Sequence, residues 1–272
     1  MILNGKVIKE KILKDLKDRI NDNSINIGLA IIQIGNDLAS DIYINEKKKM
    51  CDFIGYKFYH YKYDSNVFEE DIINKINELN NDDNIHGRLV QLPIHKKLNK
   101  DNIINSISLN KDVDGLKNNS YFIPCTPLGI LKLIDYYKID VFNKKIVVIG
   151  KSNIVGKPIS KLLIERGSNV IICDSKTNNL CEYTRNADII IIAIGKAKFL
   201  TKDLIKDNSI IIDVGINRVD GKLCGDVDFD DVIDKVSMIT PVPGGIGPMT
   251  ISALAVNLYK AYELNKKEDE EI

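Results

Sequence analysis

Apolar residues recur along the chain in two kinds of pattern that alternate. Near-continuous runs rich in Ile and Val are typical of strands covered on both faces, and segments with a helical repeat lie between them. This alternation predicts an α/β fold with largely parallel sheets. The first series of expected elements comprises a helix over 7–21, a strand within 25–35, a helix over 41–55, a strand over 56–63, a helix over 68–79 and a strand within 86–93.

A second series of the same kind follows the segment "PCTPLGILKLIDYY", which has turn residues before a helix and is a plausible bridge between two domains. Its expected strands lie at 144–150, 169–173, 187–195 and 209–215. After the cluster "TPVPGGIGP", the pattern predicts a final amphipathic helix from Met249 to Leu264.

The stretch "DIYINEKKKMCDFIG" contains three successive lysines that the helical repeat separates. Tyr43, Lys47, Met50 and Ile54 share one face, with Ile44 and Cys51 on one flank and Ile42 and Phe53 on the other. The opposite, solvated arc holds Asp41, Asn45, Lys48, Lys49 and Asp52. A lysine on the apolar face must extend its ammonium to solvent, pair, or lose its proton, because burying an unpaired charge is costly.

Composition excludes several classes of function. Lys plus Arg equals Asp plus Glu, 38 against 38, so we expect neither nucleic acid nor a membrane surface as a partner. The five cysteines are scattered without metal-ligand spacing, so we expect reduced thiols in a cytoplasmic protein and no metal site. The N-terminus becomes charged at once, and the longest apolar run, 187–195, is too short to span a bilayer.

The segment "VVIGKSNIVGKPIS" is the clearest candidate for ligand binding in the second series. A buried strand ends at Gly150, and a helix begins near Gly156 after a tight turn. Such junctions present backbone N–H groups to phosphates, although the spacing G-x-S-x-x-x-G departs from the usual dinucleotide fingerprint and also suits a purely structural turn.

The next strand ends in "IICDSKT", where dinucleotide-binding folds contact the adenosine ribose. Asp174 would accept hydrogen bonds from a ribose 2′-hydroxyl and repel a 2′-phosphate. Lys151, Ser175 and Lys176 would do the reverse, so the local charges conflict over NAD versus NADP.

Two segments of the first series also carry candidate polar groups. Gln91 follows a strand, either as part of a site or as an ordinary polar strand end. In "KDVDG", Asp112 and Asp114 form either an Asx-type turn or an acidic anchor for a ligand with amino groups. The loop "TPVPGGIGPMT" suits close approach to a ligand, although linkers are often rich in proline too.

Taken together, "YINEKKK", "GRLVQLP", "KDVDGL", "PCTPLG", "VVIGKSNIVGKP", "CDSKT", "IIDVGIN", "GDVDF" and "ITPVPGGIGPMT" resemble the bifunctional methylenetetrahydrofolate dehydrogenase/cyclohydrolase family in the same order over nearly the whole chain. The resemblance implies oxidation of 5,10-methylenetetrahydrofolate with NADP, followed by hydrolysis to 10-formyltetrahydrofolate in one-carbon metabolism and purine biosynthesis. The alternatives are another small-substrate NAD(P) dehydrogenase on a similar scaffold, as in shikimate-type dehydrogenases, and a non-catalytic folate-binding regulator.

The resemblance further implies a homodimer of two-domain subunits, with a cleft between the domains. The expected catalytic domain covers 1–125 and is completed by a C-terminal helix at 249–272, and the expected Rossmann-like NAD(P)-binding domain covers 126–248. By resemblance, Lys47 is the catalytic lysine, with Tyr43, Gln91 and Asp114 beside it. The implied folate contacts are Tyr43, Gln91, Leu92, Pro93, Asp114, Pro243, Gly244 and Gly245. The implied cofactor contacts are Gly150, Lys151, Ser152, Ile154, Asp174, Ser175 and Ile216.

The residue types suit that chemistry. A neutral lysine is a suitable base for hydrolysis of a methenyl carbon if burial lowers its pKa toward neutrality. Two departures from the family pattern matter: Asp174 stands where many members have histidine, and Lys151 replaces a common arginine, so NAD is the alternative cofactor. The connection over 115–124 is also shorter than in many members.

Overall fold

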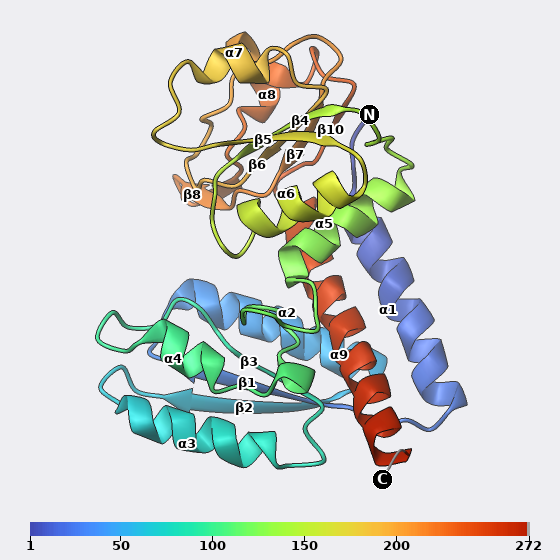
Figure 1. Ribbon diagram of the computed structural model, residues 1–272, viewed down its shortest axis with the longest axis vertical. Coiled ribbons are helices and arrows are strands. Elements are labelled where there is room, and N and C mark those ends of the chain that lie inside the picture. Colours follow the sequence, from blue (N-terminus) through green and yellow to red (C-terminus); the bar gives the residue numbers. More distant parts are fainter. Residues whose placement is uncertain (271–272) are drawn as a thin grey trace. The chain divides into compact units, whose positions relative to one another are not determined.

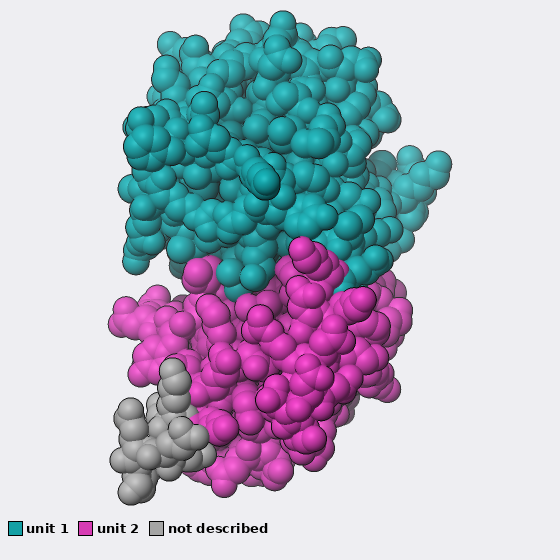
Figure 2. Space-filling view, turned by 90° about the vertical axis from the view of Figure 1, so that its right-hand side faces the viewer, with its two compact units in different colours: residues 1–10, 126–250 teal, residues 11–125, 251–272 magenta. Residues whose placement is uncertain are grey.

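The computed structural model describes the backbone of residues 1–270 and the side chains through residue 266. The chain divides into two compact units, coloured separately in Figure 2. Unit 1 consists of Met1–Glu10 and Thr126–Thr250, and unit 2 consists of Lys11–Cys125 and the residues from Ile251 onward. Each unit contains a parallel sheet with helices, which confirms the predicted α/β class.

Unit 2 is built on a three-stranded parallel sheet of order β2-β1-β3. Its strands are β1 (Gly28–Ile34), β2 (Lys57–Tyr63) and β3 (Gly87–Val90). Its helical segments are α2 (Leu38–Ile54), α3 (Glu69–Asn80), α4 (Lys100–Asn105) and the 3₁₀ turn η1 (Leu109–Lys111). Helix α2 lies over one face of the sheet and α3 over the other (Figure 1).

The core under α3 explains why this sheet forms. Side chains of the central strand, including Ile32 and Ile34, pack with Ile72, Ile76 and Leu79 of the helix. Burying each such side chain contributes about 1.5–3 kcal/mol. Strand β2 forms one edge of the sheet and remains partly exposed.

Unit 1 is built on a five-stranded parallel sheet of order β10-β7-β6-β4-β5 and an antiparallel hairpin β8-β9. Its strands are β4 (Lys145–Ile149), β5 (Asn169–Cys173), β6 (Ile189–Ile192), β7 (Ile210–Asp213), β8 (Asn217–Val219), β9 (Lys222–Cys224) and β10 (Met238–Ile239). Its helical segments are α5 (Cys125–Tyr136), α6 (Gly156–Glu165), α7 (Leu180–Thr184), the 3₁₀ turn η2 (Lys202–Leu204) and α8 (Phe229–Val232). The hydrophobic pattern predicted the four longer strands and missed the shortest elements.

The first residues of the chain belong to unit 1, whereas the sequence led us to expect them in the first domain. The backbone N–H of Leu3 donates to the Ile239 carbonyl at 2.8 Å, and the N–H of Ile239 donates to the Met1 carbonyl at 3.0 Å. These hydrogen bonds extend the sheet of unit 1 beyond β10, which is why the segment groups there.

Two long helices have residues in both units: α1 (Gly5–Asp22) and α9 (Ile246–Glu270). We predicted that helix α9 starts at Met249, and it begins three residues earlier, at Ile246. Pro248 is tolerated because the first helical turn needs no N–H from it. In unit 2, the Asn257 amide of this helix donates to the carbonyls of Val113 and Ile123, both at 2.9 Å. The last two residues of the predicted C-terminal helix, 271–272, lie outside the described residues.

Candidate functional site

Lys47 lies on the buried face of helix α2, as periodicity predicted. Ile44, Met50, Cys51 and Ile54 are buried with it, and Lys48 and Lys49 are exposed. On the second flank, Ile42 and Phe53 are 54% and 46% exposed. The buried stripe of the helix is therefore narrower on that side than the sequence pattern indicated.

The Lys47 ammonium is held by an amide side chain from the end of β3. Its Nζ donates to Gln91 Oε1 at 2.8 Å, and only 8% of the residue is exposed. Gln91 Nε2 donates to the Leu92 carbonyl at 2.7 Å, which keeps Oε1 turned toward the lysine. The position of Gln91 at the end of β3 therefore brings its side-chain amide to Lys47. This contact agrees with the interpretation of Gln91 as part of a site.

Burial lowers the pKa of Lys47, while the nearby Asp114, Cys125 and Cys51 oppose that shift. Tyr43, one turn earlier on α2, is half-buried, and burial raises its pKa. Burial therefore shifts Lys47 toward its neutral amine, which is the form that can accept a proton.

The two aspartates of "KDVDG" have different surroundings. The Asp112 carboxylate is 1% exposed and accepts the backbone N–H groups of Leu116 and Lys117 at 3.4 and 3.0 Å. Burial raises its pKa to about 6. The turn reading therefore applies to Asp112, whereas Asp114 is partly exposed and contributes its charge near Lys47.

The other residues expected at the folate occupy two segments. Leu92 is partly exposed and Pro93 exposed, immediately after Gln91. Pro243, Gly244 and Gly245 belong to unit 1, where Pro243 is exposed and both glycines are buried. A backbone hydrogen bond of 2.9 Å, from the Gly5 N–H to the Gly244 carbonyl, holds this loop against the start of α1.

The turn after β4 has the expected strand-turn-helix form. Ser152 Oγ accepts the backbone N–H groups of Val155 and Gly156 at 3.1 and 3.4 Å, so this side chain satisfies the first N–H group of helix α6. A Cβ at Gly156 would lie 1.8 Å from the Gly150 carbonyl oxygen, so the close turn requires glycine there.

The conflicting charges at the ends of β4 and β5 are paired with each other. Lys151 Nζ forms an ion pair with the Asp174 carboxylate, which also accepts the Lys176 N–H at 2.8 Å. The Lys151 hydrogen bond is the main cause that holds the pKa of Asp174 below its usual value. Ser175 is exposed, and Ile154 and Ile216 are 38% and 45% exposed.

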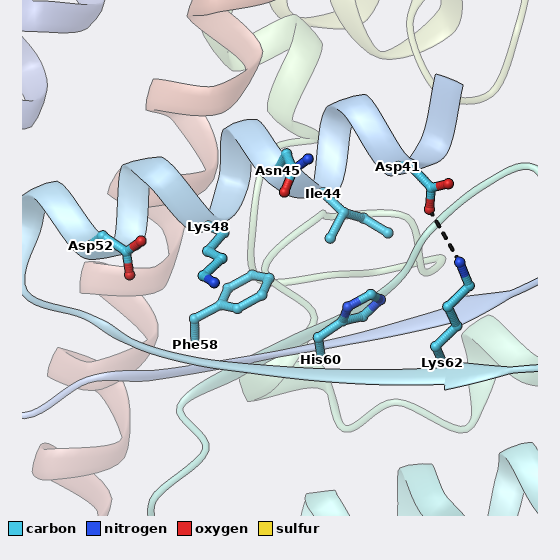
Figure 3. Close-up of a pocket in the computed structure, with 8 residues that line it drawn as sticks. All are labelled: Asp41, Ile44, Asn45, Lys48, Asp52, Phe58, His60 and Lys62. Carbon is cyan, nitrogen blue, oxygen red and sulfur yellow. Dashed lines mark hydrogen bonds and ion pairs between the residues drawn. The ribbon is translucent and has the colours of Figure 1, made fainter. Parts of the chain in front are cut away.

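A pocket lies between helix α2 and strand β2 (Figure 3). An ion pair of 3.4 Å between Asp41 and Lys62 closes one end. His60 bonds Gln33, whose Nε2 donates to Asp41 at 2.7 Å. The lining consists of Asp41, Ile44, Asn45, Lys48, Asp52, Phe58, His60 and Lys62. Most of the predicted solvated arc of the helix therefore faces this pocket.

Four buried charged residues were not identified as functional or structural candidates from the sequence. Arg88, Lys111, Asp213 and Asp226 are all 7% exposed or less. A charge inside the apolar run "GRLV" was the available signal for Arg88. Lys111 ends η1, Asp213 ends β7 and Asp226 follows β9, and charged residues are ordinary at the ends of such elements.

The described side chains place no group of three or more His, Cys, Asp or Glu residues where it would hold a metal ion. Within the same part of the chain, no helix has the length and apolar character needed to cross a membrane. All five cysteines are free thiols.

Comparison with known proteins identifies the family. The model of the tetrahydrofolate dehydrogenase/cyclohydrolase catalytic domain matches residues 3–114, and that of the family's NAD(P)-binding domain matches residues 124–266. The bifunctional protein FolD of Lachnoclostridium phytofermentans is 45% identical over 270 residues, covering 94% of this chain and 96% of its own.

Solved structures show the same similarity. The bifunctional FolD enzyme of Campylobacter jejuni is 43% identical with a TM-score of 0.93, over 97% of this chain and 99% of its own. The Trypanosoma brucei enzyme, solved with NADP cofactor and an inhibitor, is 27% identical with a TM-score of 0.93, over 97% of this chain and 98% of its own. The buried lysine, the strand-turn-helix segment and these matches lead to one conclusion: the chain belongs to the tetrahydrofolate dehydrogenase/cyclohydrolase family.

Proposed function

We propose that this protein oxidises 5,10-methylenetetrahydrofolate to the methenyl form with NADP and hydrolyses the methenyl form to 10-formyltetrahydrofolate in the cytoplasm. The observation that carries the proposal is Lys47, a buried lysine whose pKa is lowered and whose Nζ is oriented by Gln91. A lysine in this state suits a hydrolytic proton transfer and has no evident use in packing.

In the hydrolytic step, Lys47 accepts the proton of the water that adds to the methenyl carbon. A neutral Lys47 amine still has hydrogen atoms, and one of them is donated to Gln91 Oε1. This hydrogen bond also orients the lone pair of Lys47 Nζ. The C–N bond to the ring nitrogen N5 then breaks as the proton is delivered to N5. The hydroxyl group of the adduct releases its remaining proton to solvent and becomes the carbonyl of the formyl group on N10. Tyr43 and Asp114 are proposed to hold the folate beside Lys47, together with Leu92 and Pro93.

The residues of unit 1 fit a nicotinamide dinucleotide. Strand β4 ends in a close glycine turn that leads into α6, and the end of the neighbouring strand β5 presents Asp174. The nicotinamide supplies the hydride acceptor when bound. Its proposed contacts are Gly150, Lys151, Ser152, Ile154, Asp174, Ser175 and Ile216.

The pair of Lys151 and Asp174 determines the cofactor preference in this proposal. With NADP, Lys151 would exchange the Asp174 carboxylate for the 2′-phosphate, whereas with NAD the Asp174 carboxylate would accept from a ribose hydroxyl. We expect Asp174→Ser to raise the NADP to NAD ratio of kcat/KM by about 10-fold. An unchanged ratio would mean that Asp174 does not face the ribose.

The protein is proposed to form a homodimer through unit 1. Strand β5 is an edge of the five-stranded sheet, and Ile171 and Ile172 on it are 44% and 42% exposed. Ile164 at the end of α6 is 57% exposed. An open apolar edge of this kind favours pairing with a second copy. Sedimentation of the protein and of Ile172→Lys tests this, with a monomeric wild-type protein as the contrary result.

The activity is tested with purified protein, methylenetetrahydrofolate and either NADP or NAD. Reduced nicotinamide and the methenyl chromophore are followed separately, so that oxidation and hydrolysis are each measured. Turnover of both steps supports the proposal. Absence of turnover with both cofactors would overturn it.

A further inference from the structure

Two carboxylates are buried at the carboxyl edge of the unit 1 sheet. Asp213 is the last residue of β7 and is 3% exposed, and Asp226 follows β9 and is 0% exposed. Neither was given a role above. Buried carboxylates are costly unless several donors satisfy them, so their donors show what they stabilise.

Asp226 binds three consecutive backbone N–H groups of the loop that follows β6, which we call the 194–196 loop. Its Oδ2 accepts the N–H of Ile194 at 2.7 Å and that of Gly195 at 3.0 Å. Its Oδ1 accepts the N–H of Lys196 at 2.8 Å and the Asn217 side-chain amide at 2.9 Å. One side chain therefore connects the loop that follows β6 with the first residue of β8.

Asp213 in turn holds the backbone that carries Asp226. Its Oδ1 accepts the N–H of Asp226 at 3.1 Å, and its Oδ2 accepts that of Val227 at 3.0 Å. A Cβ at Gly225 would lie 1.8 Å from Asp213 Oδ2, so the approach of this carboxylate requires glycine. The sheet thus orients Asp213, Asp213 orients Asp226, and Asp226 orients the 194–196 loop.

The outer side of the same loop is open. Gly195 and Lys196 are exposed, and a Cβ added at Gly195 would meet no atom within 4 Å. In open parallel sheets, dinucleotides lie across the carboxyl ends of the strands. The backbone N–H groups of the 194–196 loop therefore point toward Asp226. The exposed outer side of the loop is the surface that a cofactor would contact. Ile216 lies directly before Asn217, the fourth donor to Asp226.

We infer that Asp226 is a positioning residue for cofactor binding, which sets the 194–196 loop and Asn217 for the nicotinamide dinucleotide without touching it. Asp213 supports it by fixing the backbone at 226–227. This inference rests on the proposed function of unit 1. It predicts that losing the Asp226 carboxylate impairs the use of NADP and leaves the hydrolytic site of unit 2 intact.

The test compares Asp226→Asn with Asp228→Asn as the matched control. Asp228 is two residues later and forms an ion pair of 3.1 Å with Lys198 outside the loop contacts. In Asp226→Asn, an amide NH₂ replaces an oxygen that accepts backbone N–H groups. We expect the KM for NADP to rise about 10- to 100-fold. The kcat at saturating NADP, the KM for the folate and hydrolysis of methenyltetrahydrofolate without nucleotide should stay within about twofold of wild type.

Amide hydrogen exchange gives a readout independent of activity. Asp226→Asn should lose protection at residues 194–196, while Asp228→Asn should not. Unchanged protection, or an unchanged KM for NADP, would overturn the inference. If Asp226→Asn does not fold, Asn217→Ala removes one donor only and should raise the KM for NADP by a smaller factor; no rise would again overturn it. A wild-type protein without either activity would instead count against the proposed function.

Discussion

Unit 2 buries basic side chains in two places, and the two places differ in the groups that accept hydrogen bonds from them. Lys47 donates to the side-chain amide of Gln91. Lys111 donates to the backbone carbonyls of Asn80 and Asp82 at 3.1 and 3.0 Å, and Arg88 donates to the Ile76 carbonyl at 3.3 Å. These three carbonyls lie at the C-terminal end of α3 or just beyond it, where the helix dipole stabilises positive charge.

The comparison teaches that burial alone does not identify a lysine with a chemical role. Burial lowers the pKa of both Lys47 and Lys111. Lys111 donates to two backbone carbonyls at or just beyond the C-terminal end of α3, and removing this side chain would leave both carbonyls without that donor. Lys47 supports no backbone group in this way, so its cost to folding has to be explained by function.

The largest expected effect separates the two lysines by activity. Lys47→Met should lower the rate of methenyltetrahydrofolate hydrolysis by about 10²- to 10⁴-fold, because the general base is lost, and should impair hydride transfer less. Lys111→Met should keep both activities when folded. Steady-state assays of the two steps measure this. Wild-type hydrolysis in Lys47→Met would refute the role assigned to that residue.

In stability, Lys111→Met should be the more damaging of the same two variants, whereas in activity Lys47→Met is. Lys111→Met is expected to lose about 1–3 kcal/mol of unfolding free energy, because the carbonyls of Asn80 and Asp82 lose their donor. Lys47→Met removes a buried amine and should be neutral or stabilising. Urea denaturation measures both, and a larger loss in Lys47→Met would reverse the comparison.

Arg88 offers a smaller test within the α3 cluster. Its Nε and Nη2 have no hydrogen-bond partner among the described residues, and burial lowers its pKa to about 9. Asn80 Oδ1, which also binds Arg88, still accepts the Ser108 N–H at 3.1 Å if the arginine is removed. We expect Arg88→Leu to be neutral or stabilising by about 1–2 kcal/mol in urea denaturation. A loss above about 2 kcal/mol would show that the guanidinium has a further partner.

The smallest effect is a pH dependence. The folded-state pKa of Lys47 lies below the ordinary lysine value of 10.5, so between these two values the unfolded chain binds the extra proton. Stability contributed by this site therefore rises with pH across that window, by at most about 1.4 kcal/mol per pH unit. The unfolding free energy of wild type relative to Lys47→Met should increase with pH in that window. A difference that does not change with pH would mean that Lys47 titrates normally.

Much of the local structure could be predicted because it depends on neighbours in sequence. The helical repeat placed Lys47 with Met50 and Ile54 and separated it from Lys48, and burial in the structure agrees. The repeat did not predict that Ile42 and Phe53 would be exposed, because the width of the buried stripe depends on what packs against the helix.

The partners of the charged groups could not be predicted from local pattern. Gln91 reaches Lys47 across 44 positions, and Asp226 reaches Ile194 across 32. Lys151 and Asp174 could be read only as opposing charges until adjacent strands brought them together. The choice between a turn and an anchor in "KDVDG" likewise depended on which carboxylate the backbone enclosed.

By itself, the sequence determined the α/β class, the order of the main elements and the side of helix α2 that Lys47 occupies, since these follow from the spacing of apolar residues along one chain. Tertiary structure alone decided which buried charges are oriented for chemistry and which only satisfy the backbone. The physical reason is that the cost of a buried charge depends on the donors and acceptors around it, and the fold brings these together from distant segments.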